Sequence, residues 1–443
     1  MLFQAKSSFK ENIKKMNIFA FPLIIQFTLN YIIGLIDQAF IGRISTEAFG
    51  AVGVVNSFLY MIGGIFGSLA VVLNIRAGNE IGLGRDKEFN YEFKSSFILS
   101  AFIGIVFFIF IHIFKSPILI FLYGFEGEAL KAGADFFTYM SPYLLLQMLI
   151  FVFNQYFKVK NNTKWLLYGS LIASIINLVL DYLFVFGGLG FPKLGVKAAA
   201  FSTILGLFVN LLILIVKSDF KIDFNIRKLK DYFKIIKQQI LESIPLFGQE
   251  ILEGSFFAVI MNSIVTRIGI LELSIYLILN QLINFLFVPM HMYGSATLTM
   301  SSKAFGSKNY DELKKLPMTG ALLSMSFYIV MSVFYIVSRK YLPNIISDDK
   351  NVIEGASDLM IFIIITHIFN PVMTMYKNAL IAMKEAKFVL YQTTIINIFT
   401  VAIVFIFVYI FHLGLYGVFL SSFLNSLLVF VLFYIKLKKV IKR

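Results

Sequence analysis

The chain has 443 residues, of which 58% are hydrophobic and only 14% charged, and its mean hydropathy is +0.82. Soluble proteins are about 45–50% apolar and about 25% charged, so these values exclude an ordinary soluble protein and indicate an integral membrane protein. The absence of cysteine excludes disulfides and thiolate metal sites, and the net charge of +14 predicts cationic loops beside a membrane rather than a nucleic-acid surface.

Twelve apolar segments are long enough to cross a bilayer, which takes about 20 mostly apolar residues. The predicted spans are residues 17–41, 48–73, 95–114, 132–157, 165–187, 195–216, 241–266, 273–299, 317–338, 357–382, 388–411 and 415–435. The two terminal segments and the loops after even-numbered spans carry 29 lysines and arginines, against 9 in the other loops and at the start of the span 195–216. Because cytoplasmic loops carry the basic excess, both termini are predicted to be cytoplasmic.

The two halves of the chain repeat at a nearly constant offset of 222–224 residues. The matches include Pro22, Gln26, Arg43, Asn56, Gly82 and Glu88 with Pro245, Gln249, Arg267, Asn280, Gly306 and Glu312. Each repeat has six spans, an even number, so both enter the membrane in the same direction. The sequence predicts an all-α membrane protein with two six-helix lobes, residues 1–217 and 241–443, related by a pseudo-two-fold axis along the membrane normal.

Residues 218–240 join the two predicted lobes. This segment carries six basic residues, and its apolar residues recur at helical spacing on one face. We interpret it as an interfacial helix lying on anionic lipid. The alternative is a solvated cytoplasmic linker.

Four acidic residues lie well inside predicted spans, namely Asp37, Asp181, Glu250 and Glu253. An ionised carboxylate in the middle of a span costs at least about 2.5–3.5 kcal/mol, so such residues indicate function. We expect Asp37 to carry a proton or a cation. The alternative, an ion pair with Arg43, is awkward because six residues separate the two by about 9 Å along a helix.

Asn177 and Asp181 are four residues apart and therefore share one helix face. An amide oxygen and a carboxylate there could bind Na⁺ or share a proton; the alternative is a polar clasp between helices. Glu250 and Glu253 are also neighbours, so one should hold a proton at neutral pH. They form either a site for a substrate cation or an acidic helix end. Lys377 is the single cation well inside a predicted span, unless it snorkels to the interface.

Four stretches resemble motifs of the multidrug and toxic compound extrusion (MATE) transporters, and the resemblance runs from about Ile18 to Tyr434. Residues 34–56 (GLIDQAFIGRISTEAFGAVGVVN) resemble the motif of spans 1 and 2, 177–184 (NLVLDYLF) that of span 5, 195–205 the start of span 6, and 302–309 (SKAFGSKN) the turn after span 8. The resemblance implies an antiporter of the bacterial cytoplasmic membrane that exports organic compounds by alternating access while H⁺ or Na⁺ enters. It implies a monomer acting on small organic molecules in the lipid bilayer, with no nucleic-acid partner, no enzymatic activity and no cofactor besides the coupling ion.

The resemblance also implies two sets of site residues. Asp37, Asn177, Asp181 and Thr203 fall on the family's N-lobe cation site, where Na⁺ could bind Asp37, Asn177 and Asp181. Glu253 falls where one branch of the family carries a C-lobe cation-binding glutamate, but that branch has an aspartate where this chain has Asn370. We group Glu250, Glu253, Gln281 and Asn370 as a C-lobe or substrate-cavity set and expect coupling in the N-lobe.

Two other functions remain open from the sequence. One is a flippase for lipid-linked oligosaccharides from the same superfamily, which a cationic rather than an acidic cavity would favour. The other is a polytopic membrane enzyme, which needs a clustered acidic metal motif or a His/Asp pair that the sequence lacks. Because the acids inside the spans outnumber Lys377, we expect flat, hydrophobic, monovalent cations as preferred substrates.

Overall fold

The computed structural model describes residues 9–42, 46–220 and 229–442, and these are almost entirely helical, with no strand among them. Helices suit hydrocarbon because every backbone N–H and C=O finds its partner within the same segment. The elements are α1 (Phe9–Gly42), α2 (Thr46–Gly82), α3 (Asp86–Tyr123), α4 (Gly127–Met140), α5 (Tyr143–Val159), α6 (Lys164–Phe184), η1 (Gly188–Gly190), α7 (Val196–Lys217), α8 (Leu229–Gln249), the π-helix η3 (Glu250–Phe256), α9 (Phe257–Ile268), α10 (Ile270–Leu286), α11 (Val288–Gly306), α12 (Tyr310–Val337), η4 (Leu342–Ile345), α13 (Lys350–Thr366), α14 (Asn370–Ala382), α15 (Ala386–Phe405), the π-helix η5 (Ile406–Ile410) and α16 (Gly414–Lys442).

The described helices supply all twelve predicted spans. Nine continuous stretches are long and apolar enough to cross a membrane, and three bent pairs add one span each: α4 with α5 (41°), α10 with α11 (47°) and α13 with α14 (44°). A proline lies at each break: Pro142 caps α5, and Pro289 and Pro371 lie in the first turns of α11 and α14. Proline lacks an N–H and clashes with the preceding turn, so a helix readily restarts there at a new angle.

The helices pack into two compact units that are not continuous in sequence. The N-unit consists of Phe21–Ala77 and Arg85–Ser243, and the C-unit of Met1–Ala20, Gly78–Gly84 and Ile244–Arg443. The breaks after Ala20 and Ser243 are separated by the same offset that relates Pro22 to Pro245 in the sequence repeat. The first turns of α1 therefore pack in the C-unit, while the equivalent first turns of α8 pack in the N-unit.

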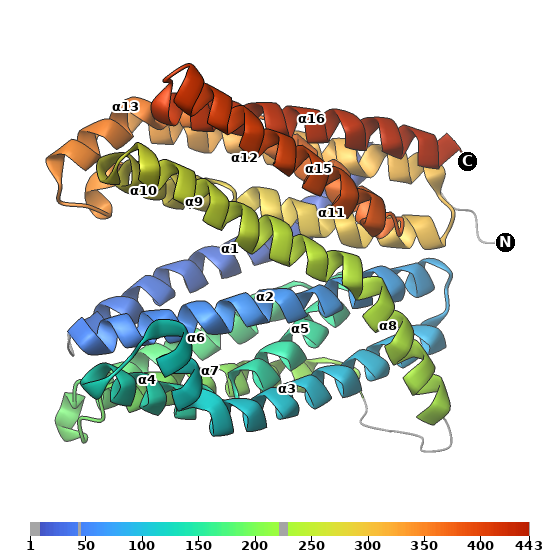
Figure 1. The fold of residues 1–443 in the computed structure, drawn as a ribbon. Coiled ribbons are helices and arrows are strands. Elements are labelled where there is room, and N and C mark those ends of the chain that lie inside the picture. Colours follow the sequence, from blue (N-terminus) through green and yellow to red (C-terminus); the bar gives the residue numbers. More distant parts are fainter. Residues whose placement is uncertain (1–8, 43–45, 221–228, 443) are drawn as a thin grey trace. The chain divides into compact units, whose positions relative to one another are not determined.

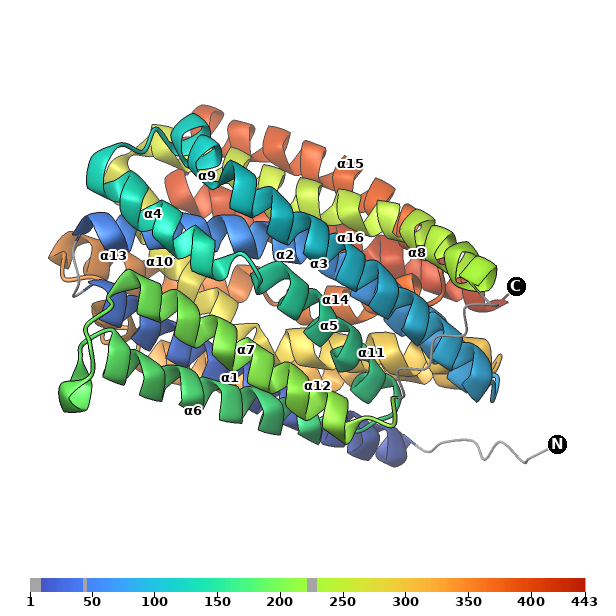
Figure 2. The same ribbon diagram turned by 90° about the horizontal axis from the view of Figure 1, so that it is seen from below.

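The N-unit is built around α3, α5, α6 and α7. Helices α6 and α7 lie side by side along their whole length (Figure 2), and α3 and α5 share an aromatic core. In that core the Phe93 ring lies 5.3 Å from Phe153, 5.2 Å from Tyr156 and 4.9 Å from Phe220 between ring centroids. Such edge-on contacts add specific geometry to the burial of apolar surface.

In the C-unit, α11, α12 and α14 pack against one another, and α16 packs against α14. Small residues allow this close approach. A Cβ on Gly320 of α12 would lie 2.5 Å from the Thr297 hydroxyl of α11, and one on Gly294 would lie 2.8 Å from the Asn378 amide of α14. Close helix contact through small residues is typical of membrane proteins, where dispersion rather than water exclusion drives packing.

Two repeat-related glycines make a reciprocal contact within the C-unit. A Cβ on Gly82 would lie 2.1 Å from the Lys303 carbonyl oxygen, and a Cβ on Gly306 would lie 2.2 Å from the Asn79 carbonyl oxygen. Each glycine therefore faces the residue three positions before the other glycine. The end of α2 and the end of α11 cross so closely that both positions require glycine.

The predicted linker, residues 218–240, is described only in part, because residues 221–228 lie outside the described ranges. From Leu229 the chain is helical, as α8. Tyr232 of α8 is buried, with its ring 5.7 Å from that of Tyr91 in α3. One side of this segment is thus covered by protein, and whether the rest lies on lipid stays a prediction.

Candidate functional site

Three helices of the N-unit bring together the carboxylates that the sequence singles out. Asp37 of α1 and Asp181 of α6 are neighbours, with their carboxyl groups close enough to interact directly. Asn177 lies one turn before Asp181, and its amide nitrogen lies 3.0 and 3.2 Å from the two Asp37 oxygens when its oxygen accepts from the Thr203 N–H at 3.2 Å. The Ser202 hydroxyl of α7 donates to Asp181. The predicted residues Asp37, Asn177, Asp181 and Thr203 therefore form one cluster, which Ser202 completes.

Close packing of α6 against α7 holds this cluster in place. A Cβ on Gly206 of α7 would lie 3.0 Å from the Ala173 carbonyl oxygen and 3.6 Å from the Asn177 Cβ, so glycine lets the helices approach at this level. Asp181 and Asn177 are only 2% and 7% exposed, whereas Asp37 is half-buried. The cluster therefore has one closed side on α6 and α7 and one accessible member on α1.

The cluster has the chemical groups that a proton or small-cation site requires. Two neighbouring carboxyl groups with little access to water favour a proton on one of them. Among the described residues no lysine or arginine forms an ion pair with Asp37 or Asp181; Arg43, the alternative partner, lies outside those residues. Carboxylate, hydroxyl and amide oxygens are also the ligands of a hard cation. The donor set thus fits H⁺ or Na⁺ as a transported ion.

A second ionisable cluster lies in the C-unit, on the π-helix η3. Glu253 Oε2 accepts from the Lys377 Nζ of α14 at 2.7 Å, and Glu253 Oε1 accepts from the Thr393 hydroxyl of α15. Glu250, three residues before Glu253, and His291 of α11 both lie within electrostatic range of Lys377. Lys377 is therefore not a snorkelling residue but the partner of Glu253.

Two predicted C-lobe residues have other placements. Asn370 is the first residue of α14, at the bend after α13, where its N–H donates to the His367 carbonyl oxygen at 3.1 Å. Gln281 lies on the exposed face of α10. One branch of the family has an aspartate at the position of Asn370. In this chain, Glu253 instead contacts Lys377, about two turns after Asn370 on α14.

The Glu253–Thr393 contact has a neutral equivalent in the N-unit. Ser170 of α6 donates to the Asn30 Oδ1 of α1 at 2.7 Å. Asn30 and Ser170 precede Glu253 and Thr393 by the offset of the repeat, the one that relates Pro22 to Pro245. The same pair of helix positions is therefore a neutral contact in one unit and a charged one in the other.

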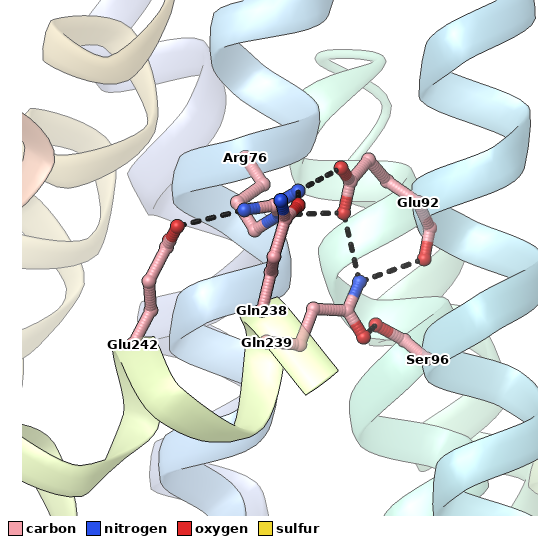
Figure 3. A network of polar contacts seen from close by, with 6 residues as sticks. All are labelled: Arg76, Glu92, Ser96, Gln238, Gln239 and Glu242. Atoms are coloured by element: carbon pink, nitrogen blue, oxygen red, sulfur yellow. Dashed lines mark hydrogen bonds and ion pairs between the residues drawn. The ribbon is translucent and has the colours of Figure 1, made fainter. Parts of the chain in front are cut away.

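A third polar cluster, which the sequence analysis missed, attaches α8 to the N-unit. Figure 3 shows Arg76 of α2 between Glu92 of α3 and Glu242 of α8, with Gln239 beside Glu92. Arg76 donates to both Glu92 oxygens at 2.6 and 2.7 Å and to Glu242 at 2.7 Å; Gln239 donates to Glu92 at 2.9 Å and accepts from the Ser96 hydroxyl at 2.9 Å. Two-pronged arginine–carboxylate contacts of this kind are strong and directional. Glu242 of α8 is therefore part of an ion-pair cluster of the N-unit.

A many-span helical protein with carboxylates inside its spans has the architecture of a membrane transporter. The MatE family model matches this chain over residues 22–183 and again over 245–410, two copies whose starts are separated by the offset of the repeat. The chain belongs to the MATE family of transporters, which confirms the resemblance and the predicted all-α, multi-pass fold.

Known relatives are distant in sequence but similar in length. The "Uncharacterized transporter YisQ" of Bacillus subtilis is 22% identical over 410 residues, covering 90% of this chain and 88% of its own length. The "Probable multidrug resistance protein NorM" of Thermotoga maritima is 23% identical over 347 residues, 76% of this chain and 72% of its own. A crystal structure of MATE in complex with MaL6 superposes with a TM-score of 0.86 at 18% identity, covering 98% of each chain.

Proposed function

We propose that the protein is a monomeric antiporter that exports organic cations across the bacterial cytoplasmic membrane in exchange for H⁺ or Na⁺. The observation that carries this proposal is the Asp37–Asn177–Asp181 cluster on α1 and α6 of the N-unit. The multidrug resistance name of the NorM relative supports export of drugs. The start of α1 and the end of α16 lie at the same end of the C-unit (Figure 1 and Figure 2), which supports two cytoplasmic termini.

Competition for the same carboxylates couples the ion to the substrate. With Asp37 and Asp181 ionised, the cluster attracts an organic cation and offsets the cost of removing that cation from water. A proton or Na⁺ bound between the two acids lowers this negative charge and favours release of the organic cation. A ligand can shift a conformational equilibrium only through such differential binding, so exchange at one cluster drives alternating access.

Two neighbouring carboxyl groups at a largely buried site support H⁺ as the coupling ion, because removing both from water favours a proton on one of them. The carboxylate, hydroxyl and amide oxygens of the same cluster are also ligands that Na⁺ accepts. No cofactor other than the transported ion enters the proposal.

The coupling ion is tested by reconstituting the purified protein in proteoliposomes and imposing a pH gradient or a Na⁺ gradient alone. We expect the pH gradient to drive accumulation of a cationic dye. Accumulation under the Na⁺ gradient alone would assign Na⁺ as the coupling ion. If neither gradient drove accumulation, antiport itself would be refuted.

Substrate charge is tested by competition between a cationic and an anionic dye of similar size. Fixed carboxylates repel an anion in addition to the cost of removing it from water, and aromatic side chains add about 0.5–2 kcal/mol for each good cation–π contact. We expect the cation to be transported faster. Equal or faster transport of the anion would show that the acids do not line the substrate path and would favour the flippase instead.

A further inference from the structure

The C-unit holds a carboxylate whose two oxygens already have partners. Glu253 takes the Lys377 ammonium on one oxygen and the Thr393 hydroxyl on the other. The two charged side chains are 21% and 24% exposed, so solvent and small ions reach the edge of the pair without separating it. Glu253 thus has its cation within the protein chain, whereas Asp37 and Asp181 form no ion pair with a lysine or arginine in the described ranges.

The ammonium group of Lys377 competes strongly with free cations for the Glu253 carboxylate. Because α14 and η3 belong to the same packed unit, the ammonium is presented to Glu253 at an effective concentration of at least about millimolar. A free cation would have to displace it and leave a charged lysine partly buried without its partner, which is strongly unfavourable. Binding at Glu253 is therefore closed to small cations while Lys377 is in place.

The repeat shows that the charge is an addition to a neutral framework. The equivalent N-unit contact, Asn30 with Ser170, holds its two helices together without any charge. Joining η3 to α15 therefore does not require an acid at residue 253. Since an acid in a span is costly, its lysine partner is the feature that makes it tolerable.

We propose that Lys377 is a positioning residue that sets ion specificity: its ammonium occupies the cation position on Glu253 and confines coupling-ion binding to the Asp37–Asp181 cluster. Lys377 acts through Glu253 and need not touch the substrate. The inference rests on the proposed ion-coupled antiport. Because its test reads ion binding rather than transport, a failure of drug export would refute that function and leave this assignment to be decided separately.

The experiment uses the full-length protein purified in detergent, with Asp37→Asn to silence the N-unit cluster. Bound sodium is measured with radioactive Na⁺ and bound protons by potentiometric titration in the neutral range, where a carboxylate paired with lysine stays ionised. In this background we expect Glu253→Gln to change neither quantity, because Lys377 already fills the position. Lys377→Met should add one exchangeable ion, a proton or Na⁺, per protein molecule.

Three further variants show whether the added ion is bound at Glu253. Adding Glu253→Gln to Lys377→Met should abolish the gain, and this doubly neutral pair also avoids an unpaired charge. Adding Glu250→Gln, the matched change on the same π-helix, should preserve the gain. Lys377→Arg, which keeps the cation, should behave like the parent.

Two results would overturn the proposal. One is a loss of bound ion on Glu253→Gln while Lys377 is present, which would show that Glu253 already exchanges its cation. The other is a folded Lys377→Met variant that gains no ion. If Lys377→Met does not fold, the Glu253→Gln measurement still decides between the two outcomes.

Discussion

The N-unit and the C-unit use the same helix positions for different chemistry. At the level of the N-unit carboxyl cluster, the described residues of the C-unit make uncharged contacts, in which the Asn425 amide donates to the Thr400 hydroxyl and to the Asn397 amide oxygen, each at 2.8 Å. Under the offset that relates Pro22 to Pro245, Asp37, Asn177, Asp181 and Ser202 correspond to Ile260, Thr400, Val404 and Asn425. The C-unit instead places its acid at Glu253, two turns before Ile260, and neutralises it with Lys377.

The difference shows that the repeat sets the framework and a few side chains set the function. Both units hold the corresponding helices together through hydroxyl and amide groups, so the packing does not depend on the acids. Only the N-unit has two carboxyl groups in contact with no ion-paired cation among the described residues. On this comparison, the proposed ion exchange belongs to the N-unit, and the C-unit carries a compensated charge.

The largest expected effect tests the N-unit half of the comparison. Asp37→Asn keeps the shape and hydrogen bonding of the side chain but removes its titration, and Asp181→Asn does the same. Coupling energies of about 1–3 kcal/mol correspond to about 5–150-fold, and we expect losses of ion-driven export at the upper end. Initial export rates in proteoliposomes at matched protein amounts provide the measurement.

The matched control lies in the C-unit. Thr400→Val, at the position equivalent to Asn177, should leave driven export close to the wild-type rate. Full export by a properly expressed Asp37→Asn variant would contradict the assignment of ion exchange to the N-unit.

The next largest effect concerns the contacts that the first turns of α8 make in the N-unit, compared with those of the first turns of α1 in the C-unit. In the N-unit, Gln239 and Glu242 of α8 join the Arg76 cluster, whereas the equivalent residues of α1 in the C-unit are the buried Met16 and Phe19. Arg76→Met leaves the buried Glu92 without its cation, so we expect a loss of about 3–5 kcal/mol in unfolding free energy. Thermal unfolding in detergent measures it.

A surface ion pair provides the control for Arg76. Lys160 and Asp86 pair at 3.1 Å with side chains 37% and 72% exposed. Lys160→Met should cost only about 0–1 kcal/mol, as exposed pairs do. Equal losses for the two variants would mean that the Arg76 cluster does not fasten α8.

A smaller effect tests the equivalence of the repeats directly. Because Gly82 and Gly306 make reciprocal contacts, Gly82→Ala and Gly306→Ala should each destabilise the protein by about 1–3 kcal/mol, and by similar amounts. Gly53→Ala in α2, where a Cβ meets nothing within 4 Å, should be neutral or stabilising by up to about 1 kcal/mol. Thermal unfolding of the three variants decides; a large difference between the first two would break the symmetry.

The smallest expected effect tests the role of Glu253 in the C-unit. Glu253→Gln should reduce driven export less than Asp37→Asn does, by about fivefold, the lower end of typical coupling. The cause would be the unpaired Lys377, so the double variant with Lys377→Met should recover part of the loss. If Glu253→Gln proved the less active of the two single variants, the main coupling site would lie in the C-unit.

Much of the fold is predictable from sequence because bilayer thickness sets the length of an apolar span. All twelve spans were placed in this way, but their bends were not. Pro142, Pro289 and Pro371 lie at breaks, whereas Pro22 and Pro117 lie inside continuous helices. Neighbouring side chains decide which proline bends its helix, and local composition does not specify those neighbours.

The candidate site was predictable where its members are close in sequence. Asn177 and Asp181 share a helix face by spacing alone, and both join the cluster. Ser202 gave no signal, because serine is common in membrane helices and its role depends on how α7 meets α6. Lys377 and Glu253 are 124 residues apart, so their ion pair depends on packing that apolar periodicity leaves unspecified.

The first turns of α1 pack in the C-unit and those of α8 in the N-unit, and this exchange affects the order in which the protein can fold during synthesis. Domains generally fold from the N-terminus as the chain emerges, but Arg76 and Glu92 receive Gln239 and Glu242 only after the whole first half has been inserted. Conversely, Asn17 of α1 accepts from the Tyr293 hydroxyl at 2.6 Å. The first turns of α1 therefore form this contact only after residue 293 has been synthesised. Neither half can bury the first turns of its own first helix alone, so both halves must be synthesised before either unit is complete.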